Sequence, residues 1–280
     1  MLDLVVHDER PGPRPGDADA INVWRDDRGA VFAEAFRDAG RYRLDWRGIG
    51  TLAFDTGPRV DFWPAAGVAA AEAIDRFLRI AQPVVLQALG YETLHASAVR
   101  LPAGTAAFCG PSGTGKSTLA YALGRRAGIE QFADDAVVLT FGDAGISAAA
   151  LPFRSRLRPS AQTFFDRAEA HAVDPASATP VPLVAVFILS QPDTQASAIE
   201  ITRIAPRSAF AAVLTHAHCF DEHDPSTTAR MIPHYLDVVA RVPIFQLAYI
   251  PDFTRLDELA DVVCETVERT AVAAPADVRR

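Results

Sequence analysis

The chain has 280 residues, of which 49% are hydrophobic and 22% are charged. That is enough to bury one sizeable core, or one main domain with a smaller one attached. The formal net charge of −8 at pH 7 argues against a protein that follows a nucleic-acid backbone or lies on anionic lipid. The solidly apolar run LVAVFIL, residues 183–189, is too short to span a bilayer and suits a buried strand.

The N-terminus and the cysteines indicate a cytoplasmic protein. The opening residues carry early acidic groups and no long apolar core, which argues against a secretory signal. Cys109, Cys219 and Cys264 are widely spaced and form neither a disulfide framework nor a paired metal motif. We therefore expect a cytoplasmic chain that binds neither nucleic acid nor membrane.

Residues 1–90 are predicted to form a small α+β module. Residues 9–19 are rich in Pro and Gly and predict a loop, whereas 31–62 contain short alternating runs that predict small strands with tight turns. A helix follows, in which one face carries Ala70, Ile74, Phe77, Leu78 and Ala81. Pro83 is expected to open a second short helix that ends near Gly90.

Residues 91–270 are predicted to form an α/β domain, followed by a C-terminal tail at 271–280. The pattern predicts a strand, a tight turn and a second strand over 93–109, then a glycine-rich loop and a helix that ends near Gly128. The further predicted elements are a strand within 130–142, an extended stretch to 158, a helix after 160, strands at 183–189 and 198–204, helices at 207–218 and 226–241, a strand at 244–250 and a helix at 254–270.

Residues 110–117, GPSGTGKS, match the phosphate-loop pattern G-x-x-x-x-G-K-[ST] between an apolar strand and an amphipathic helix. The loop N–H groups and the helix dipole would hold phosphate oxygens. Lys116 would reach the β- and γ-phosphates, and the Ser117 hydroxyl would bind Mg²⁺. The predicted nucleotide-binding residues of this loop are Gly110, Pro111, Ser112, Gly113, Thr114, Gly115, Lys116, Ser117 and Thr118.

Lys116 is the only lysine among 27 lysine and arginine residues. Its ammonium is a compact charge on a flexible stem, and the planar guanidinium of arginine cannot replace it in this loop. The absence of a second lysine also excludes the N-K-x-D base-recognition motif of GTPases and the strand lysine of protein kinases.

His95 is expected at the mouth of this loop. If residues 101 and 105 face each other across the turn, His95 lies opposite residue 111, with a slip of one or two positions left open. A histidine there would supply charge or a hydrogen bond to phosphate, and phosphate would raise its pKa. A half-buried strand histidine bonded to backbone is the structural alternative.

Asp134 and Asp135 interrupt the apolar run FADDAVVL, where strand interiors disfavour aspartate. Phosphoryl transfer needs one carboxylate for Mg²⁺ and one to accept the proton of an attacking hydroxyl. Adjacent strand residues point to opposite faces, so the two would take different roles. An acidic turn before a strand is the structural alternative.

Two further groups of residues have polar side chains at regular or close spacing. Arg154, Arg156 and Arg158 alternate, so that they share a face that would bind phosphate or protect a strand edge; Arg156 is the one predicted to bind nucleotide. Residues 215–224, THAHCFDEHD, contain His216, His218, Cys219 and His223, but their spacing matches no zinc pattern and favours a polar helix end and loop.

The segments LHASAV, FCGPSGTGKSTLA and FADDAVVL together resemble the C-terminal domain of HPr kinase/phosphorylase. They resemble more closely the HPr-kinase-related proteins that include peptide-tailoring kinases of lasso-peptide gene clusters. The resemblance implies an HPr-kinase-like P-loop core that binds ATP and Mg²⁺, with Asp134 as general base, Asp135 as metal ligand, and His95 and Lys116 stabilising the phosphoryl group. It also implies a tendency to form homo-oligomers.

The leading hypothesis is an ATP- and Mg²⁺-dependent kinase that phosphorylates a serine hydroxyl of a peptide or protein. The downstream segment by which HPr kinases hold HPr is missing, and the N-terminal module differs from theirs. HPr as acceptor and the reverse phosphorylase reaction therefore stay open. The alternatives are a kinase of a small hydroxyl compound such as free serine, and a non-catalytic, nucleotide-dependent regulator that binds a peptide.

Overall fold

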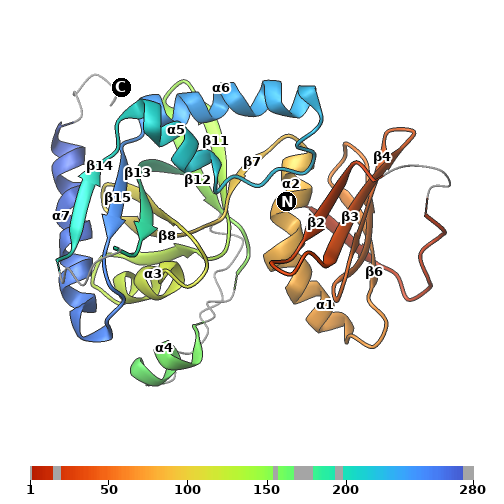
Figure 1. Ribbon diagram of the computed structural model, residues 1–280, viewed down its shortest axis with the longest axis horizontal. Helices are drawn as coiled ribbons and strands as arrows, with labels where there is room; N and C mark the ends of the chain where they lie inside the picture. The colour runs from red at the N-terminus through yellow and green to blue at the C-terminus, as the bar shows by residue number, and fades with distance from the viewer. Residues whose placement is uncertain (1, 15–19, 154–156, 167–178, 193–197, 274–280) are drawn as a thin grey trace. The chain divides into compact units, whose positions relative to one another are not determined.

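The computed structural model describes residues 2–14, 20–153, 157–166, 179–192 and 198–273. The chain is a mixed α/β protein that divides into two compact units (Figure 1). The first unit contains Met1–Tyr91 and Cys219–Arg230, and the second contains Glu92–His218 and Met231–Arg280. Over the described ranges, none of the helices combines the length and apolar character needed to cross a membrane.

The first unit is built on a six-stranded sheet in the order β1-β6-β5-β4-β3-β2. Only the β1–β6 pair is parallel. The short strands predicted within 31–62 are confirmed, whereas the four-residue strands at both edges were not predicted because they are too short to show a period. The strands are β1 (Asp3–Val6), β2 (Asn22–Arg25), β3 (Val31–Asp38), β4 (Arg41–Trp46), β5 (Gly50–Phe54) and β6 (Arg59–Pro64).

A helical segment covers one face of this sheet. It runs through α1 (Ala70–Arg76), the π-helical turn η1 (Phe77–Ala81) and α2 (Gln82–Ala88). Pro83 has no N–H to donate, and its ring crowds the carbonyl four residues earlier. The wider π-helical turn η1, which directly precedes α2, accommodates both effects. The predicted two helices are therefore joined end to end. Phe77 and Ala81 pack with alternate sheet residues such as Leu44 and Phe62.

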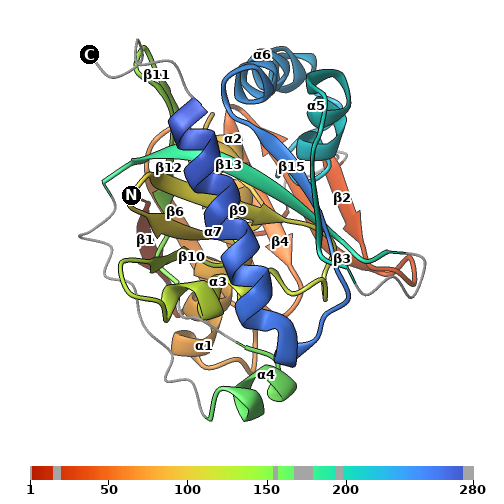
Figure 2. The same ribbon diagram turned by 90° about the vertical axis from the view of Figure 1, so that its left-hand side faces the viewer.

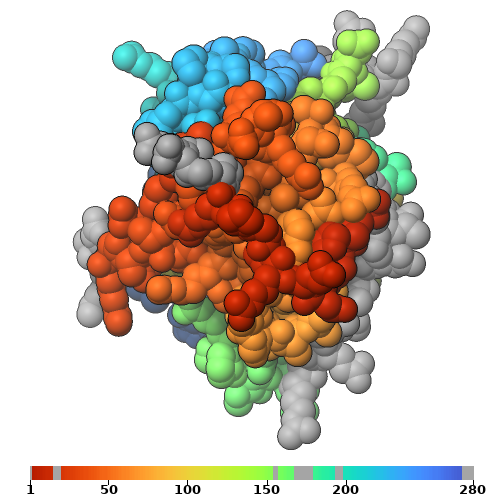
Figure 3. All heavy atoms as spheres, turned by 90° about the vertical axis from the view of Figure 1, so that its right-hand side faces the viewer, coloured from red at the N-terminus to blue at the C-terminus, as the bar shows by residue number. Residues whose placement is uncertain are grey.

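The distant segment Cys219–Arg230 completes the first unit. Phe220 is buried in its core, its N–H donates to Gln87 Oε1 at 2.6 Å, and its carbonyl accepts from Asn22 Nδ2 at 2.9 Å. These bonds satisfy backbone groups that burial would otherwise leave unpaired. Figure 3 draws residues of Met1–Tyr91 of this unit as red and orange spheres.

The second unit is built on a nine-stranded sheet with the main path β10-β8-β9-β13-β12-β11-β7. β15 pairs with β13 in parallel, and β14 pairs with β15. β9 and β13 are also parallel, so β9, β13 and β15 end at the same edge. The strands are β7 (Glu92–Leu94), β8 (Ala96–Leu101), β9 (Gly104–Cys109), β10 (Glu130–Ala133), β11 (Val137–Gly142), β12 (Gly145–Ala150), β13 (Val181–Ser190), β14 (Glu200–Arg203) and β15 (Ile244–Ala248).

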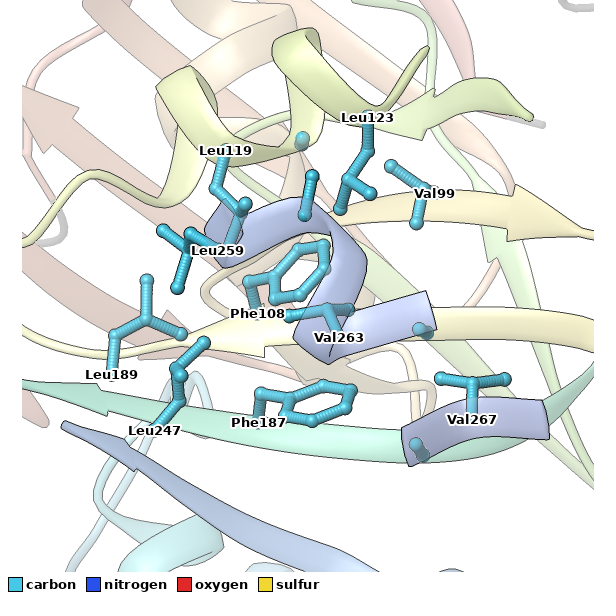
Figure 4. Close-up of a cluster of buried hydrophobic side chains, with 14 of the residues drawn as sticks. Val99, Phe108, Leu119, Leu123, Phe187, Leu189, Leu247, Leu259, Val263 and Val267 are labelled. Carbon is cyan, nitrogen blue, oxygen red and sulfur yellow. The ribbon is translucent and has the colours of Figure 1, made fainter. Parts of the chain in front are cut away.

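Two of its helices, α3 and α7, pack together against this sheet. Figure 2 shows α7 crossing the strands, and Figure 4 shows side chains of both helices meeting Phe108 and Phe187 from the strands. Truncating a buried phenylalanine here would cost about 3–5 kcal/mol. The helices are α3 (Lys116–Gly124), α4 (Pro159–Phe164), α5 (Pro206–Leu214), α7 (Leu256–Ala273) and the 3₁₀ turn η3 (Phe253–Arg255); α6 (Pro225–Arg241) begins in the segment that belongs to the first unit.

The strand predicted within 130–142 is broken at the aspartate pair. β10 ends at Ala133 and pairs with β8, whereas β11 begins at Val137 and pairs with β12 and β7. Asp135 has φ +65°, a left-handed conformation that aspartate tolerates better than most residues. The two aspartates therefore occupy a turn between strands, and the expectation that they alternate across one strand is wrong.

Three other boundaries differ from expectation. The helix predicted over 207–218 ends at Leu214, and Ala217 then bridges to Leu94 beside β7. The extended stretch expected to 158 leaves the sheet at Ala150. In the predicted hairpin Leu101 pairs with Gly104, one position from the estimate, so the register places His95 opposite residue 110.

Candidate active site

The glycine-rich loop connects the end of β9 to the start of α3. Gly110 has φ +149°, and a Cβ there would lie 2.8 Å from the Leu189 carbonyl oxygen. Gly115 has φ +99°, and a Cβ there would lie 2.7 Å from Tyr249 Oη. Both positions therefore require glycine, because the loop passes close to neighbouring strand ends in a backbone conformation that side chains disfavour.

Tyr249 holds this loop from the end of β15. Its hydroxyl donates to the Thr114 carbonyl at 2.6 Å, and burial raises the pKa of the phenol. The Thr114 side chain in turn donates to the Pro111 carbonyl at 2.8 Å. Sequence reasoning did not identify Tyr249, since a tyrosine that ends an apolar strand carries no signal of a contact across the sheet.

Lys116 lies within the loop and is only 7% exposed. Its Nζ donates to the carbonyls of Gly110 at 2.7 Å and Pro111 at 3.2 Å. Burial lowers the pKa of Lys116, and the nearby carboxylates of Asp135 and Asp134 oppose that shift. The structure thus brings the sole lysine and the acidic pair into one electrostatic environment.

Ser97 connects the acidic turn with the helix after the loop. Its buried hydroxyl donates to Asp134 Oδ1 at 2.8 Å and lies 3.4 Å from Ser117 Oγ. The Ser117 hydroxyl and the two carboxylates supply hard oxygen donors of the kind that Mg²⁺ prefers. These residues therefore fit a Mg²⁺ ion by the chemistry of their donor set. Ser97 was missed, although in the strand that the sequence predicted from residue 93 it follows His95 by two residues and would share its face.

His95 lies between β7 and β8, next to the acidic turn. Its Nδ1 lies 3.0 Å from the Asp135 carbonyl oxygen, which can only accept, so Nδ1 carries a proton. Burial and the Lys116 charge lower the pKa of His95, so the ring is neutral at pH 7 and Nε2 holds a lone pair. In this form His95 accepts a proton, and it donates to phosphate oxygens only after it has done so.

The segment THAH forms backbone bonds beside His95. The His95 N–H donates to the His216 carbonyl at 2.7 Å, and the His218 N–H donates to the Thr93 carbonyl at 2.9 Å. The rings of His95 and His218 lie 6.1 Å apart. Burial lowers the pKa of His216 and, to about 4, that of His218. The expected helix end and loop are confirmed: α5 ends at Leu214, a turn covers Thr215 and His216, and Ala217 forms an isolated bridge to Leu94.

The remaining predicted residues divide into two groups. Arg154 and Arg156 lie outside the described residues, whereas Arg158 contacts the loop through Ser112. In the part of the chain that the structure describes, no three histidine, cysteine or acidic side chains gather closely enough to hold a metal ion. His216, His218, Cys219 and His223 thus do not form a metal cluster there.

No family model matches the chain, and no curated protein matches it. Among solved structures, the chain is similar to the Hpr(Ser) kinase/phosphatase from Coxiella burnetii. The two share 11% sequence identity, and the match covers 63% of this chain and 97% of the other, with a TM-score of 0.37.

Proposed function

We propose that the second unit is an ATP- and Mg²⁺-dependent kinase that phosphorylates a serine hydroxyl of a peptide or protein. The observation that carries the proposal is the connection from the phosphate loop through Ser117 and Ser97 to Asp134, with Lys116 beside it. A carboxylate, a cation and a phosphate-binding loop in one site are the parts that phosphoryl transfer requires.

The residues divide the chemistry as follows. The loop N–H groups and Lys116 would bind the β- and γ-phosphates. Ser117 and Asp135 would hold Mg²⁺, which when bound would neutralise phosphate charge. Asp134 accepts the proton of the serine hydroxyl as its oxygen attacks the γ-phosphorus. The bond from that phosphorus to the bridging oxygen breaks, and ADP leaves with the electron pair. His95 stabilises the transferred group once protonated.

A peptide acceptor is favoured by the sequence resemblance to peptide-tailoring kinases, including those of lasso-peptide gene clusters. The test is mass spectrometry of serine-containing peptides incubated with the protein, Mg²⁺ and ATP, with free serine in a parallel reaction. We expect phosphate on a peptide with the unaltered protein. Phosphate on free serine alone would assign a small-molecule acceptor, and ATP binding without any product would assign a non-catalytic regulator.

Variants connect the product to the site. Asp134→Asn keeps the shape of the side chain but cannot accept the proton, so transfer should fall about 10²–10⁴-fold with nucleotide affinity retained. Lys116→Ala should weaken nucleotide binding at least about tenfold. The exposed Asp143, in the turn between β11 and β12, provides the matched control, and Asp143→Asn should behave as the unaltered protein.

A further inference from the structure

Arg158, the residue before α4, lies against the third and fourth residues of the phosphate loop. Its Nη2 donates to Ser112 Oγ at 3.3 Å. At Gly113, a Cβ would lie 3.5–3.8 Å from the guanidinium atoms of Arg158. The guanidinium therefore borders the loop itself, where phosphates are expected.

The backbone that carries Arg158 is anchored. The preceding Leu157 is buried and packs in a small cluster with Tyr121 of α3 and Ala161 of α4. The Leu157 carbonyl accepts from Gln162 Nε2 at 2.7 Å, and the Gln162 N–H donates to the Arg158 carbonyl at 2.9 Å. α3 is the helix that follows the loop, so this packing sets the position of Arg158 relative to the phosphate loop.

The charge around Arg158 favours an anion. In the described part of the chain, no carboxylate forms an ion pair with Arg158, whereas Arg126, Arg241 and Arg255 of the same unit each pair with an acidic side chain. Lys116 is close enough that, after burial, the Arg158 charge helps to lower its pKa. Two neighbouring cations repel each other, and a polyphosphate placed between them removes that repulsion.

We propose that Arg158 is a catalytic residue that contacts the γ-phosphoryl group during transfer, as an arginine supplied by the same chain. This inference rests on the proposed kinase function. The planar guanidinium offers several N–H donors in a geometry that matches phosphate oxygens. As the bond between the γ-phosphorus and the bridging oxygen breaks, charge develops on oxygens near Ser112 and Gly113, and Arg158 stabilises it. The serine proton still passes to Asp134.

The test compares Arg158→Ala and Arg158→Lys with Arg207→Ala. Arg207 is an exposed residue of α5 for which no hydrogen bond or ion pair is seen within the described ranges, so its removal controls for net charge. Calorimetry measures affinity for Mg²⁺·ADP with and without aluminium fluoride, which mimics the phosphoryl group in transfer. The peptide reaction measures the rate of transfer.

We expect Arg158→Ala to bind ADP within about threefold of the unaltered protein but to lose at least about tenfold of the enhancement by aluminium fluoride. Its transfer rate should fall about 10²–10³-fold. Arg158→Lys keeps the charge but lacks the planar guanidinium. Its fluoride enhancement and its transfer rate should therefore lie between those of Arg158→Ala and the unaltered protein. Arg207→Ala should match the unaltered protein.

Two negative results are distinguishable. If the unaltered protein binds no nucleotide, the proposed kinase function fails and the role of Arg158 fails with it. If the unaltered protein binds ADP and transfers phosphate, but Arg158→Ala shows the same fluoride enhancement and rate, the role of Arg158 alone is overturned.

Discussion

The hydroxyl of Ser97 lies between Asp134 Oδ1, at 2.8 Å, and Ser117 Oγ, at 3.4 Å. Ser97 is fully buried, and because its single proton is given to the carboxylate, its lone pairs face the remaining neighbours. Ser97 thus orients the expected general base and places it beside the residue expected to bind Mg²⁺. It acts on the reaction through these two side chains.

Ser97→Ala should reduce phosphoryl transfer about tenfold, since a hydrogen bond to a charged group contributes roughly 1.5–3 kcal/mol. Nucleotide affinity should stay within about threefold, because the loop contacts are intact. Steady-state kinetics with the peptide acceptor would measure both. The double variant with Asp134→Asn should be no slower than Asp134→Asn alone, and fully additive effects would contradict a shared role.

Tyr249→Phe should destabilise the second unit by about 1–2 kcal/mol, because it removes the buried donor to the Thr114 carbonyl. Nucleotide affinity should fall as well, since the loop loses its tie to β15. Urea unfolding and calorimetry would measure the two effects. Tyr121→Phe is the matched control, because among the described residues its hydroxyl accepts one long bond of 3.5 Å, from Arg125. Unchanged affinity in Tyr249→Phe would contradict the role of Tyr249.

Gly115→Ala should abolish detectable nucleotide binding or lower its affinity more than about tenfold. The added Cβ would lie 2.7 Å from Tyr249 Oη, and the positive φ adds roughly 1 kcal/mol of strain. Gly128→Ala is the matched control, with φ +79° but open space around the Cβ. It should share the strain and keep the affinity. Equal affinities in the two variants would show that the close approach does not matter.

The second unit should become less stable as pH falls from about 6.5 to 4. His218 has its folded pKa lowered from 6.5 to about 4, mainly by burial, and Nδ1 has no hydrogen-bond partner among the described residues. Between these values the unfolded chain binds a proton that the folded chain does not, so the free energy of unfolding drops, by roughly 1–3 kcal/mol for His218. The lowered pKa values of His95 and His216 act in the same direction.

Urea unfolding between pH 4.5 and 7.5 would measure this dependence. His218→Asn should flatten it in part, because the proton-binding group is removed from both states. His223→Asn is the control, since that side chain is 77% exposed. An identical pH dependence in His218→Asn and the unaltered protein would rule out the assigned contribution of His218.

Sequence patterns predicted the elements that depend on local information. The hairpin before the loop, the strand at 183–189, the strand at 244–250 and the last helix all lie close to their expected places. Each has a strong hydrophobic period or a turn residue that acts within a few positions. The break at Asp134 and Asp135 was not predicted, because the apolar residues on both sides continue a single period while their hydrogen-bond partners lie on different strands.

The candidate site shows the same division. The motif GPSGTGKS and the lone lysine were enough to predict a nucleotide-binding loop. A loop of this kind binds phosphate with its own backbone N–H groups and with adjacent residues, so the local sequence carries the signal. Only the tertiary structure brought Ser97, Tyr249 and Arg158 to it, from β8, the end of β15 and the residue before α4. Serine, tyrosine and arginine occur throughout the chain, and what distinguishes these three is a contact made between elements distant in sequence. Such contacts arise from strand order and helix packing, which no local period encodes.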